Sequence, residues 1–303
     1  MEQKLKVKWV EWVDWTNLSN KQISKILKKY SFHELDIEAC MEENQRARID
    51  VYDDYIFMVL HFPKYNQKTK VYNLNEFNIF LGKDFLITFR EFEWKQIDKI
   101  FNDYMNLNLE DDSDFKITSG YILYEIIQVM LEKMFKFIDN IKKDLKTVES
   151  QVFEKPDASF VKEIMIKKRN IIIMKHMLLP QINVMKLIEI QMNKMFKWEM
   201  EEYFEDLEDK ISKVVNDIKT LEEYINSIED AFKTIIDIRT NKVMTLLAMF
   251  SAFLLPLTLV TSFYWMNIEL PFQENALVVF LLLFITLIIM FFWYKYLKNK
   301  WDF

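Results

Sequence analysis

The sequence predicts an α/β domain in water, followed by long helices and by two C-terminal helices that cross a membrane. Three observations predict this order. Short apolar runs rich in aromatic residues occur before Glu91. Between Gly120 and Thr240, apolar residues recur at helical spacing without a single intervening glycine. Beyond Val243 the chain is much more apolar than before, as the hydrocarbon core of a bilayer requires.

The N-terminal domain, residues 1–118, combines strand and helix signals. Three runs are short, apolar and rich in aromatic residues, which is typical of strands: Tyr55–Phe62, Glu76–Leu81 and Phe85–Phe89. Two segments, Asn20–Tyr30 and Glu34–Glu43, carry apolar residues at three- and four-residue spacing, which is typical of helices. The mixture predicts an α/β domain large enough to bury a core.

The stretch 119–242 predicts a helical stalk. A proline and an aspartate within Glu154–Ser159 supply a turn and a helix start, so we expect a break there. A second break is expected around Phe196–Glu201. The last helix then runs from about Glu201 to Tyr264, a length of about 95 Å at 1.5 Å per residue. Such a rod cannot fold back into one globule.

Two segments are long and apolar enough to cross a bilayer. Val243–Ile268 has 26 residues without a formal charge and Ala276–Trp293 has 18, where about 20 suffice. Both are too uniformly apolar for buried helices of a soluble protein. The predicted parts are a transmembrane helix at 243–264, an outer loop at 265–275, a second transmembrane helix at 276–294 and a basic tail at 295–303.

Basic residues flank both predicted spans on one side only. The flanking residues are Arg239, Lys242, Lys295, Lys298 and Lys300. Segments rich in Lys and Arg next to membrane spans usually lie on the cytoplasmic side. The N-terminus also lacks the pattern of a signal peptide. We therefore expect both termini in the cytoplasm and the chain in the inner membrane of the cell. The loop acids Glu269 and Glu274 then face outward.

Composition excludes several classes of function. The net charge is −6, and no cluster of Lys and Arg of the kind that binds nucleic acid is visible. The two glycines, Gly82 and Gly120, are too few for a phosphate-binding loop. The histidines are scattered and Cys40 is the single cysteine, so neither zinc-ligand spacing nor an internal disulfide is available. No catalytic residue or resident cofactor is predicted, and a soluble enzyme is a distant alternative.

One face of the first predicted span is small and oxygen-bearing. It consists of Asn241, Met244, Ala248, Ser251, Leu255, Thr258 and Ser262. The opposite face is bulkier and almost wholly apolar. Small and hydroxylated residues can serve close helix packing, or they can line a pore when several copies surround an axis. Neither span contains Asp, Glu, Lys, Arg or His, so a proton relay or a carboxylate cage within the membrane is not expected.

The segment Arg239–Asn267 resembles the first transmembrane segment of CorA-type magnesium channels, which ends in a Tyr-Gly-Met-Asn signature. Here the signature is Tyr264, Trp265, Met266 and Asn267. The resemblance extends over nearly the whole chain. It includes the segments Glu43–Pro63, Ile79–Glu91 and Met177–Met185, and the lysine-rich C-terminus.

The resemblance implies a homopentamer in the lipid bilayer, in which the long helix forms a cytoplasmic funnel and then lines a pore for divalent cations. Magnesium is the expected cation, with cobalt or nickel as further cargo. Asn267 would bind the hydrated ion at the outer mouth, and the rings of Glu269 and Glu274 would concentrate cations. The residues implied for the inner pore and its hydrophobic gate are Asn241, Met244, Leu247 and Leu255.

Two departures from the family pattern bear on function. The family senses cytoplasmic magnesium through acids at subunit interfaces. Asp206 and Asp209 match such acids, but the expected acidic pair near Cys40 is Glu38 followed by Ala39. Trp265 replaces the glycine of the signature, where an indole could narrow the mouth or anchor the chain at the interface. A zinc transporter of the same superfamily and a non-conducting membrane scaffold are therefore alternatives.

Overall fold

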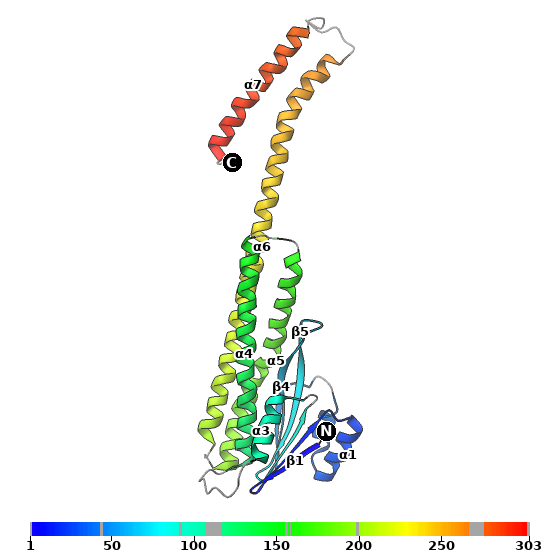
Figure 1. The fold of residues 1–303 in the computed structure, drawn as a ribbon, viewed down its shortest axis with the longest axis vertical. Helices are drawn as coiled ribbons and strands as arrows, with labels where there is room; N and C mark the ends of the chain where they lie inside the picture. The colour runs from blue at the N-terminus through cyan, green and yellow to red at the C-terminus, as the bar shows by residue number, and fades with distance from the viewer. Residues whose placement is uncertain are drawn as a thin grey trace. The chain divides into compact units, whose positions relative to one another are not determined.

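The computed structural model describes residues 2–42, 45–90, 93–106, 117–154, 157, 159–197, 200–266 and 276–301. The chain divides into two compact units, Met1–Asp230 and Ala231–Phe303. Figure 1 shows the ribbon with its helices and strands labelled.

The first unit contains a six-stranded sheet with the order β1-β2-β6-β5-β4-β3. All neighbouring strands are antiparallel except β2 and β6, which are parallel. The strands are β1 (Glu2–Val7), β2 (Val10–Thr16), β3 (Arg48–Val51), β4 (Ile56–Asn66), β5 (Val71–Leu81) and β6 (Phe85–Arg90). The predicted strands Glu76–Leu81 and Phe85–Phe89 are confirmed as parts of β5 and β6. The predicted strand Tyr55–Phe62 is confirmed as part of β4, except that Tyr55 precedes the strand.

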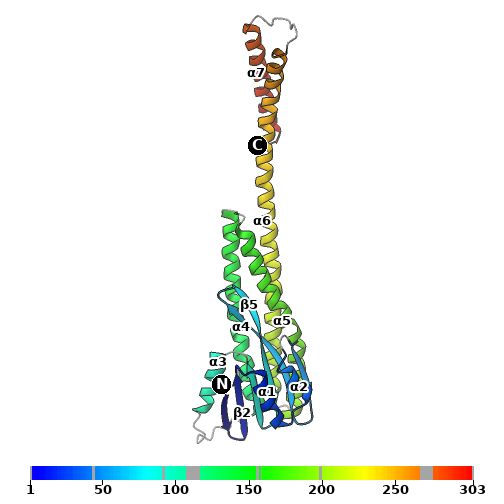
Figure 2. The same cartoon turned by 90° about the vertical axis from the view of Figure 1, so that its right-hand side faces the viewer.

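Two short helices, α1 (Asn20–Leu27) and α2 (Glu34–Ala39), cover one face of the sheet (Figure 2). Their apolar residues join an aromatic core that includes Trp15, Phe57 and Phe80. A 3-10 turn continues α1 to Tyr30, so the predicted helix Asn20–Tyr30 is confirmed. The predicted second helix ends earlier, at Ala39, and its last predicted residue, Glu43, lies outside the described residues.

The other face is covered by α3 (Lys95–Met105) and by the long helices α4 (Ser119–Glu154) and α5 (Ser159–Phe196). The first part of α6 (Glu201–Tyr264) packs on these two long helices. The predicted breaks after Glu154 and after Phe196 are confirmed. Ion pairs join α5 to α6 in antiparallel order: Lys168–Glu229 at 2.7 Å, Lys175–Glu222 at 2.6 Å and Lys186–Glu208 at 3.3 Å.

Two amide side chains fix α5 against the β4–β5 hairpin. Gln181 accepts a bond from the backbone N–H of His61 at 3.1 Å and donates to its carbonyl at 2.9 Å. Asn170 accepts a bond from the backbone N–H of Tyr72 at 3.1 Å and donates one to the carbonyl of Lys70 at 2.8 Å. Buried backbone groups outside the sheet ladder need partners, so these amides act in place of a neighbouring strand. By length and composition α5 is apolar enough to span a membrane. Its apolar face, however, packs against other elements of the first unit.

The second unit consists of the C-terminal part of α6 and α7 (Ala276–Trp301). Both meet the length and hydropathy of a membrane span, and almost none of their apolar surface is covered within the chain. Figures 1 and 2 show α7 returning beside this part of α6. The helix predicted from Glu201 to Tyr264 is confirmed, with Pro256 inside it.

Candidate ion pathway and metal-sensing residues

One face of α6 in the second unit is covered by α7. The half-buried residues between Val243 and Tyr264 recur every three or four positions, as one helix face does. They are Thr245, Met249, Ala252, Phe253, Pro256, Leu257, Val260 and Tyr264. The rings of Phe253 and Tyr294 lie 6.1 Å apart, and Met290 is buried on α7. This face therefore provides the contact with α7.

All eight residues predicted to line the pore are exposed in the single chain. They are Asn241, Met244, Leu247, Ala248, Ser251, Leu255, Thr258 and Ser262. At 3.6 residues per turn, their mean direction lies about 150° from that of the half-buried set. The side chains of Leu247 and Leu255 are each 67% exposed. The predicted pore face is thus nearly opposite the face that packs on α7.

The hydroxyl groups near this face are directed by bonds to their own helix. Thr258 Oγ1 donates to the Leu254 carbonyl at 2.8 Å. On a neighbouring flank, Thr261 Oγ1 donates to the carbonyls of Leu257 (3.1 Å) and Thr258 (3.0 Å). A hydroxyl whose hydrogen is used in this way offers only oxygen lone pairs to its surroundings. Such oxygens can accept bonds from the water molecules around a cation.

The signature begins at Tyr264, the last residue of α6, and Trp265 and Met266 follow the helix. Trp265 N–H still donates to the carbonyls of Thr261 (3.1 Å) and Ser262 (3.2 Å), so the backbone makes a final turn. Tyr264 is half-buried, whereas Met266 is exposed and the Trp265 side chain is 89% exposed. Asn267, Glu269 and Glu274 lie outside the described residues.

The predicted sensing residues lie on two different layers of the first unit. Glu38 is exposed on α2, and its neighbour Ala39 is 3% exposed in the core. On α6, Asp209 is exposed, and Asp206 accepts a bond from Lys210 at 2.5 Å. The sheet separates α2 from α6 within one chain, so only a second chain can bring these acids together. In the described part of the chain, no three His, Cys, Asp or Glu side chains are grouped to hold a metal ion.

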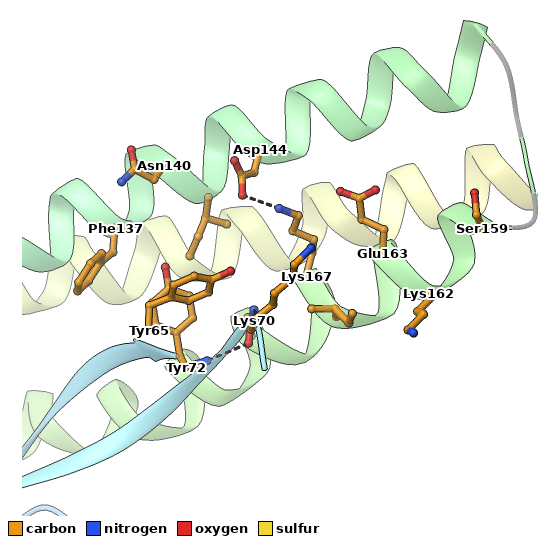
Figure 3. Close-up of a pocket in the computed structure, with 13 residues that line it drawn as sticks. Tyr65, Lys70, Tyr72, Phe137, Asn140, Asp144, Ser159, Lys162, Glu163 and Lys167 are labelled. Atoms are coloured by element: carbon orange, nitrogen blue, oxygen red, sulfur yellow. Dashed lines mark hydrogen bonds and ion pairs between the residues drawn. The ribbon is translucent and has the colours of Figure 1, made fainter. Parts of the chain in front are cut away.

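A cavity of about 550 Å³ between the β4–β5 hairpin and helices α4 and α5 was missed by sequence reasoning. We call it the hairpin cleft. Figure 3 shows Lys167 of α5 reaching to Asp144 of α4, at 2.5 Å. Lys70, Lys162 and Glu163 also line the cleft, beside the rings of Tyr65, Tyr72 and Phe137. Lys68 and Lys70 of the hairpin turn mark one side of the cleft in the sequence, but nothing in the sequence places them beside α4 and α5.

Comparison with known proteins identifies relatives over nearly the whole chain. The profile of a family described as "CorA-like Mg2+ transporter protein" matches residues 8–298. The chain is 22% identical over 277 residues to the cobalt/magnesium transport protein CorA of Thermotoga maritima, covering 90% of this chain and 77% of that protein.

Two solved structures have a similar fold over the parts of the chain that they cover. The CorA magnesium transporter from Methanocaldococcus jannaschii has a TM-score of 0.81 at 18% identity, covering 95% of this chain and 90% of that one. The ZntB cytoplasmic domain from Vibrio parahaemolyticus has a TM-score of 0.63 at 14% identity, covering 77% and 90%. The predicted order of an α/β domain, long helices and apolar C-terminal helices is thereby confirmed.

Proposed function

Because the chain belongs to the CorA-like Mg2+ transporter family, a family of membrane metal-ion transporters, we propose that it conducts a divalent cation through a pore built by several copies of itself. Magnesium is the proposed cation, with cobalt or nickel as further cargo. Five copies are proposed, with the exposed face of α6 turned toward their common axis. The ion is cargo, and no resident cofactor or catalytic step is involved.

One observation supports this proposal above the others: α7 packs on the face of α6 that lies about 150° from the oxygen-bearing face. Contact with α7 therefore does not account for the small and hydroxylated residues of α6. In a membrane, such residues need a neighbouring helix or water. A water-filled axis shared by several copies provides that water for the oxygen-bearing face, while α7 covers the opposite face of α6.

The neutral oxygens of this face suit a cation that keeps its water. Magnesium dehydrates reluctantly, and the face offers amide and hydroxyl oxygens at Asn241, Ser251, Thr258 and Ser262 without any charge. These oxygens can accept bonds from the hydration shell and leave the ion free to move on. A carboxylate at the same depth would bind the bare ion more tightly and slow its release.

The apolar members of the face form the proposed gate. Met244, Leu247 and Leu255 are each more than 60% exposed in the single chain. Rings of such side chains can close a pore by excluding water from it. At the outer end, Asn267 would hold the hydrated ion, while Glu269 and Glu274 would raise the local cation concentration. Tyr264, Trp265 and Met266 would complete the mouth.

The membrane potential would drive the ion inward. We propose that both termini are cytoplasmic and that the membrane is the inner membrane, because the basic residues flank both apolar helices on one side. A potential of 100 mV contributes about 2.3 kcal/mol per elementary charge, hence about twice as much for a divalent cation. No other energy source is required for uptake.

We propose that cytoplasmic magnesium closes the pore through Asp206 and Asp209 of one copy and Glu38 of the next. The layer arrangement supports a site between copies, because one chain keeps these acids on opposite sides of its sheet. Ala39 removes one acid from the family pattern, and Lys210 already neutralises part of the charge of Asp206. Closure should therefore need more magnesium than a complete acidic pair would.

Flux into liposomes tests the proposal. Full-length protein should carry magnesium, and Asn267→Ala should abolish that flux. Thr258→Val, which removes an oxygen from the proposed pore face, should lower flux severalfold. Thr261→Val is the matched control, because its hydroxyl makes the same kind of bond on a different flank of α6. Equal effects of the two valine variants would contradict the assignment of the pore face.

Two alternatives have their own outcomes in the same assay. The likeness of the fold to the ZntB cytoplasmic domain over 77% of this chain favours a test of zinc beside magnesium. Faster zinc flux that also requires Asn267 would assign the chain to zinc. A non-conducting scaffold, as Trp265 could imply, would show no flux for any cation, and Trp265→Gly would not restore it.

A further inference from the structure

We propose that the hairpin cleft, together with the adjacent end of the α4–α5 helical hairpin, docks onto the headgroups of anionic lipids at the membrane surface. This role goes beyond ion transport. It requires only that the chain is anchored in a bilayer, and it is independent of which ion the pore carries.

Basic charge gathers at the cleft although the chain as a whole has a net charge of −6. Lys70, Lys162 and Lys167 line it, against the two carboxylates of Asp144 and Glu163. Lys167 pairs with Asp144 at 2.5 Å. For the side chains of Lys70 and Lys162, the described part of the chain provides no partner. These two ammonium groups are therefore free to meet an external anion.

Large apolar side chains are exposed at the same end of the helical hairpin. Phe153, in the last turn of α4, is 61% exposed, and Val161 and Met165, in the first turns of α5, are 44% and 65% exposed. Val161 and Met165 are four residues apart and so share one face of α5. Apolar residues beside lysines are the pattern of a surface that inserts shallowly among lipid headgroups.

The antiparallel pairing of α5 and α6 identifies which end of the bundle this is. Along α5 toward its first residue, the partners on α6 rise from Glu208 through Glu222 to Glu229. Higher numbers on α6 lead to the uncharged segment that begins at Val243. The basic and apolar end of the hairpin is thus the end at which α6 leaves the first unit for that segment.

The cleft also has the chemistry and size for a headgroup. Its volume of about 550 Å³ exceeds that of a single phosphate. Burial raises the pKa of Tyr72 to about 12, so its hydroxyl remains a neutral donor at physiological pH. Tyr65, 42% exposed, lies against Tyr72 with ring centroids 5.0 Å apart. Tyrosines of this kind are favoured at the boundary between lipid and water.

Lipid quenching of a fluorophore measures docking directly. Val161→Cys in the full-length chain is labelled with a maleimide fluorophore and placed in nanodiscs that contain a nitroxide-headgroup lipid. The native Cys40 is buried and serves as the unlabelled background. Strong quenching is expected in phosphatidylglycerol discs and weak quenching in phosphatidylcholine discs. The position control is Lys21→Cys, on exposed α1 at the other face of the sheet.

A charge variant with a matched control separates docking from general attraction. Each lysine near an anionic surface favours the docked state about fivefold, so Lys70→Gln/Lys162→Gln should lower the docked-to-free ratio by about 25-fold. Lys21→Gln/Lys25→Gln removes the same charge from α1 and should leave quenching unchanged. Equal quenching at positions 161 and 21, equal quenching in the two lipids, or equal effects of the two double variants would each overturn the proposal. Cation flux does not enter this readout, so failure of the transport proposal would not be mistaken for failure of docking.

Discussion

Removal of the Asp14 carboxylate should destabilise the first unit more than any change at an exposed ion pair. Asp14 is 1% exposed and lies at the centre of a network that joins β2, β6 and α3. Arg90 Nη2 approaches it at 2.6 Å, and Arg90 Nε at 3.0 Å. Thr88 Oγ1 donates to it at 2.6 Å and in turn accepts a bond from Trp12 Nε1 at 3.2 Å.

Asp14→Ala leaves the guanidinium of Arg90 buried, with Asp98, at 2.5 Å, as its remaining charged partner among the described residues. Loss of one partner from a buried ion pair costs about 3–5 kcal/mol. For a unit of this size, each kcal/mol lowers Tm by about 2–4 °C, so a fall of about 6–20 °C is expected. Circular dichroism of the purified full-length protein during heating measures it. The two carboxylates also raise the pKa of Arg90 despite burial, so its guanidinium stays charged throughout the measurement.

The control lies on the same strand. Glu11 of β2 pairs with Lys4 at 2.6 Å, but both side chains are more than a third exposed. Exposed pairs contribute little, so Glu11→Ala should change Tm far less than Asp14→Ala. Asp14→Ala/Arg90→Met should recover part of the loss, because no uncompensated charge is then buried. A Tm for Asp14→Ala equal to that of Glu11→Ala would refute the reasoning.

Three further outcomes are expected. Burial raises the pKa of the Glu125 carboxyl group, although Tyr104 donates a 2.6 Å hydrogen bond to it. The carboxyl group therefore stays protonated to a higher pH in the folded state than in the unfolded state. The folded state loses stability as the pH rises through this range. The Tm advantage of Glu125→Gln over the native chain should therefore grow from pH 4 to pH 8, and a constant difference would contradict it. Gln181→Leu leaves the N–H and C=O of His61 unpaired and should cost about 2–5 kcal/mol in chemical unfolding, against near zero for exposed Lys21→Leu. Leu255→Asn should hydrate the gate and raise flux at high internal magnesium, whereas Leu254→Asn, on another flank, should not; the reverse order would exclude Leu255 from the gate.

The elements with strong periodicity were predictable from the sequence. The long helices, the two breaks between them and the two apolar C-terminal helices follow from the spacing of apolar residues along the chain. Tertiary contacts do not change these elements. The strands β1, β2 and β3 were not predicted. β1 alternates exposed and half-buried residues at the sheet edge, and β3 has four residues that are all at least partly exposed. Neither forms an apolar run, and their pairing depends on β2 and β4 rather than on local sequence.

Of the two candidate sites, one was predictable from the sequence and the other was not. The oxygen-bearing face of α6 was visible because seven residues at helical spacing share it. The hairpin cleft was not visible, since Lys70 and Lys162 are 92 positions apart and meet only through the bonds of Asn170 and Gln181 to the hairpin. Spacing along the chain predicts faces of single helices, whereas sites built by several elements require the packing.

The sequence left two explanations for the small residues of the first span, helix packing and a pore wall. In the structure, α7 packs on a different face of α6, where Phe253 meets Tyr294. The face that carries Ser251, Thr258 and Ser262 is exposed in the single chain. Both explanations therefore now require another copy of the chain, and both turn the same face toward it. They differ only in whether water fills the space between copies, which is what the comparison of Thr258→Val with Thr261→Val measures.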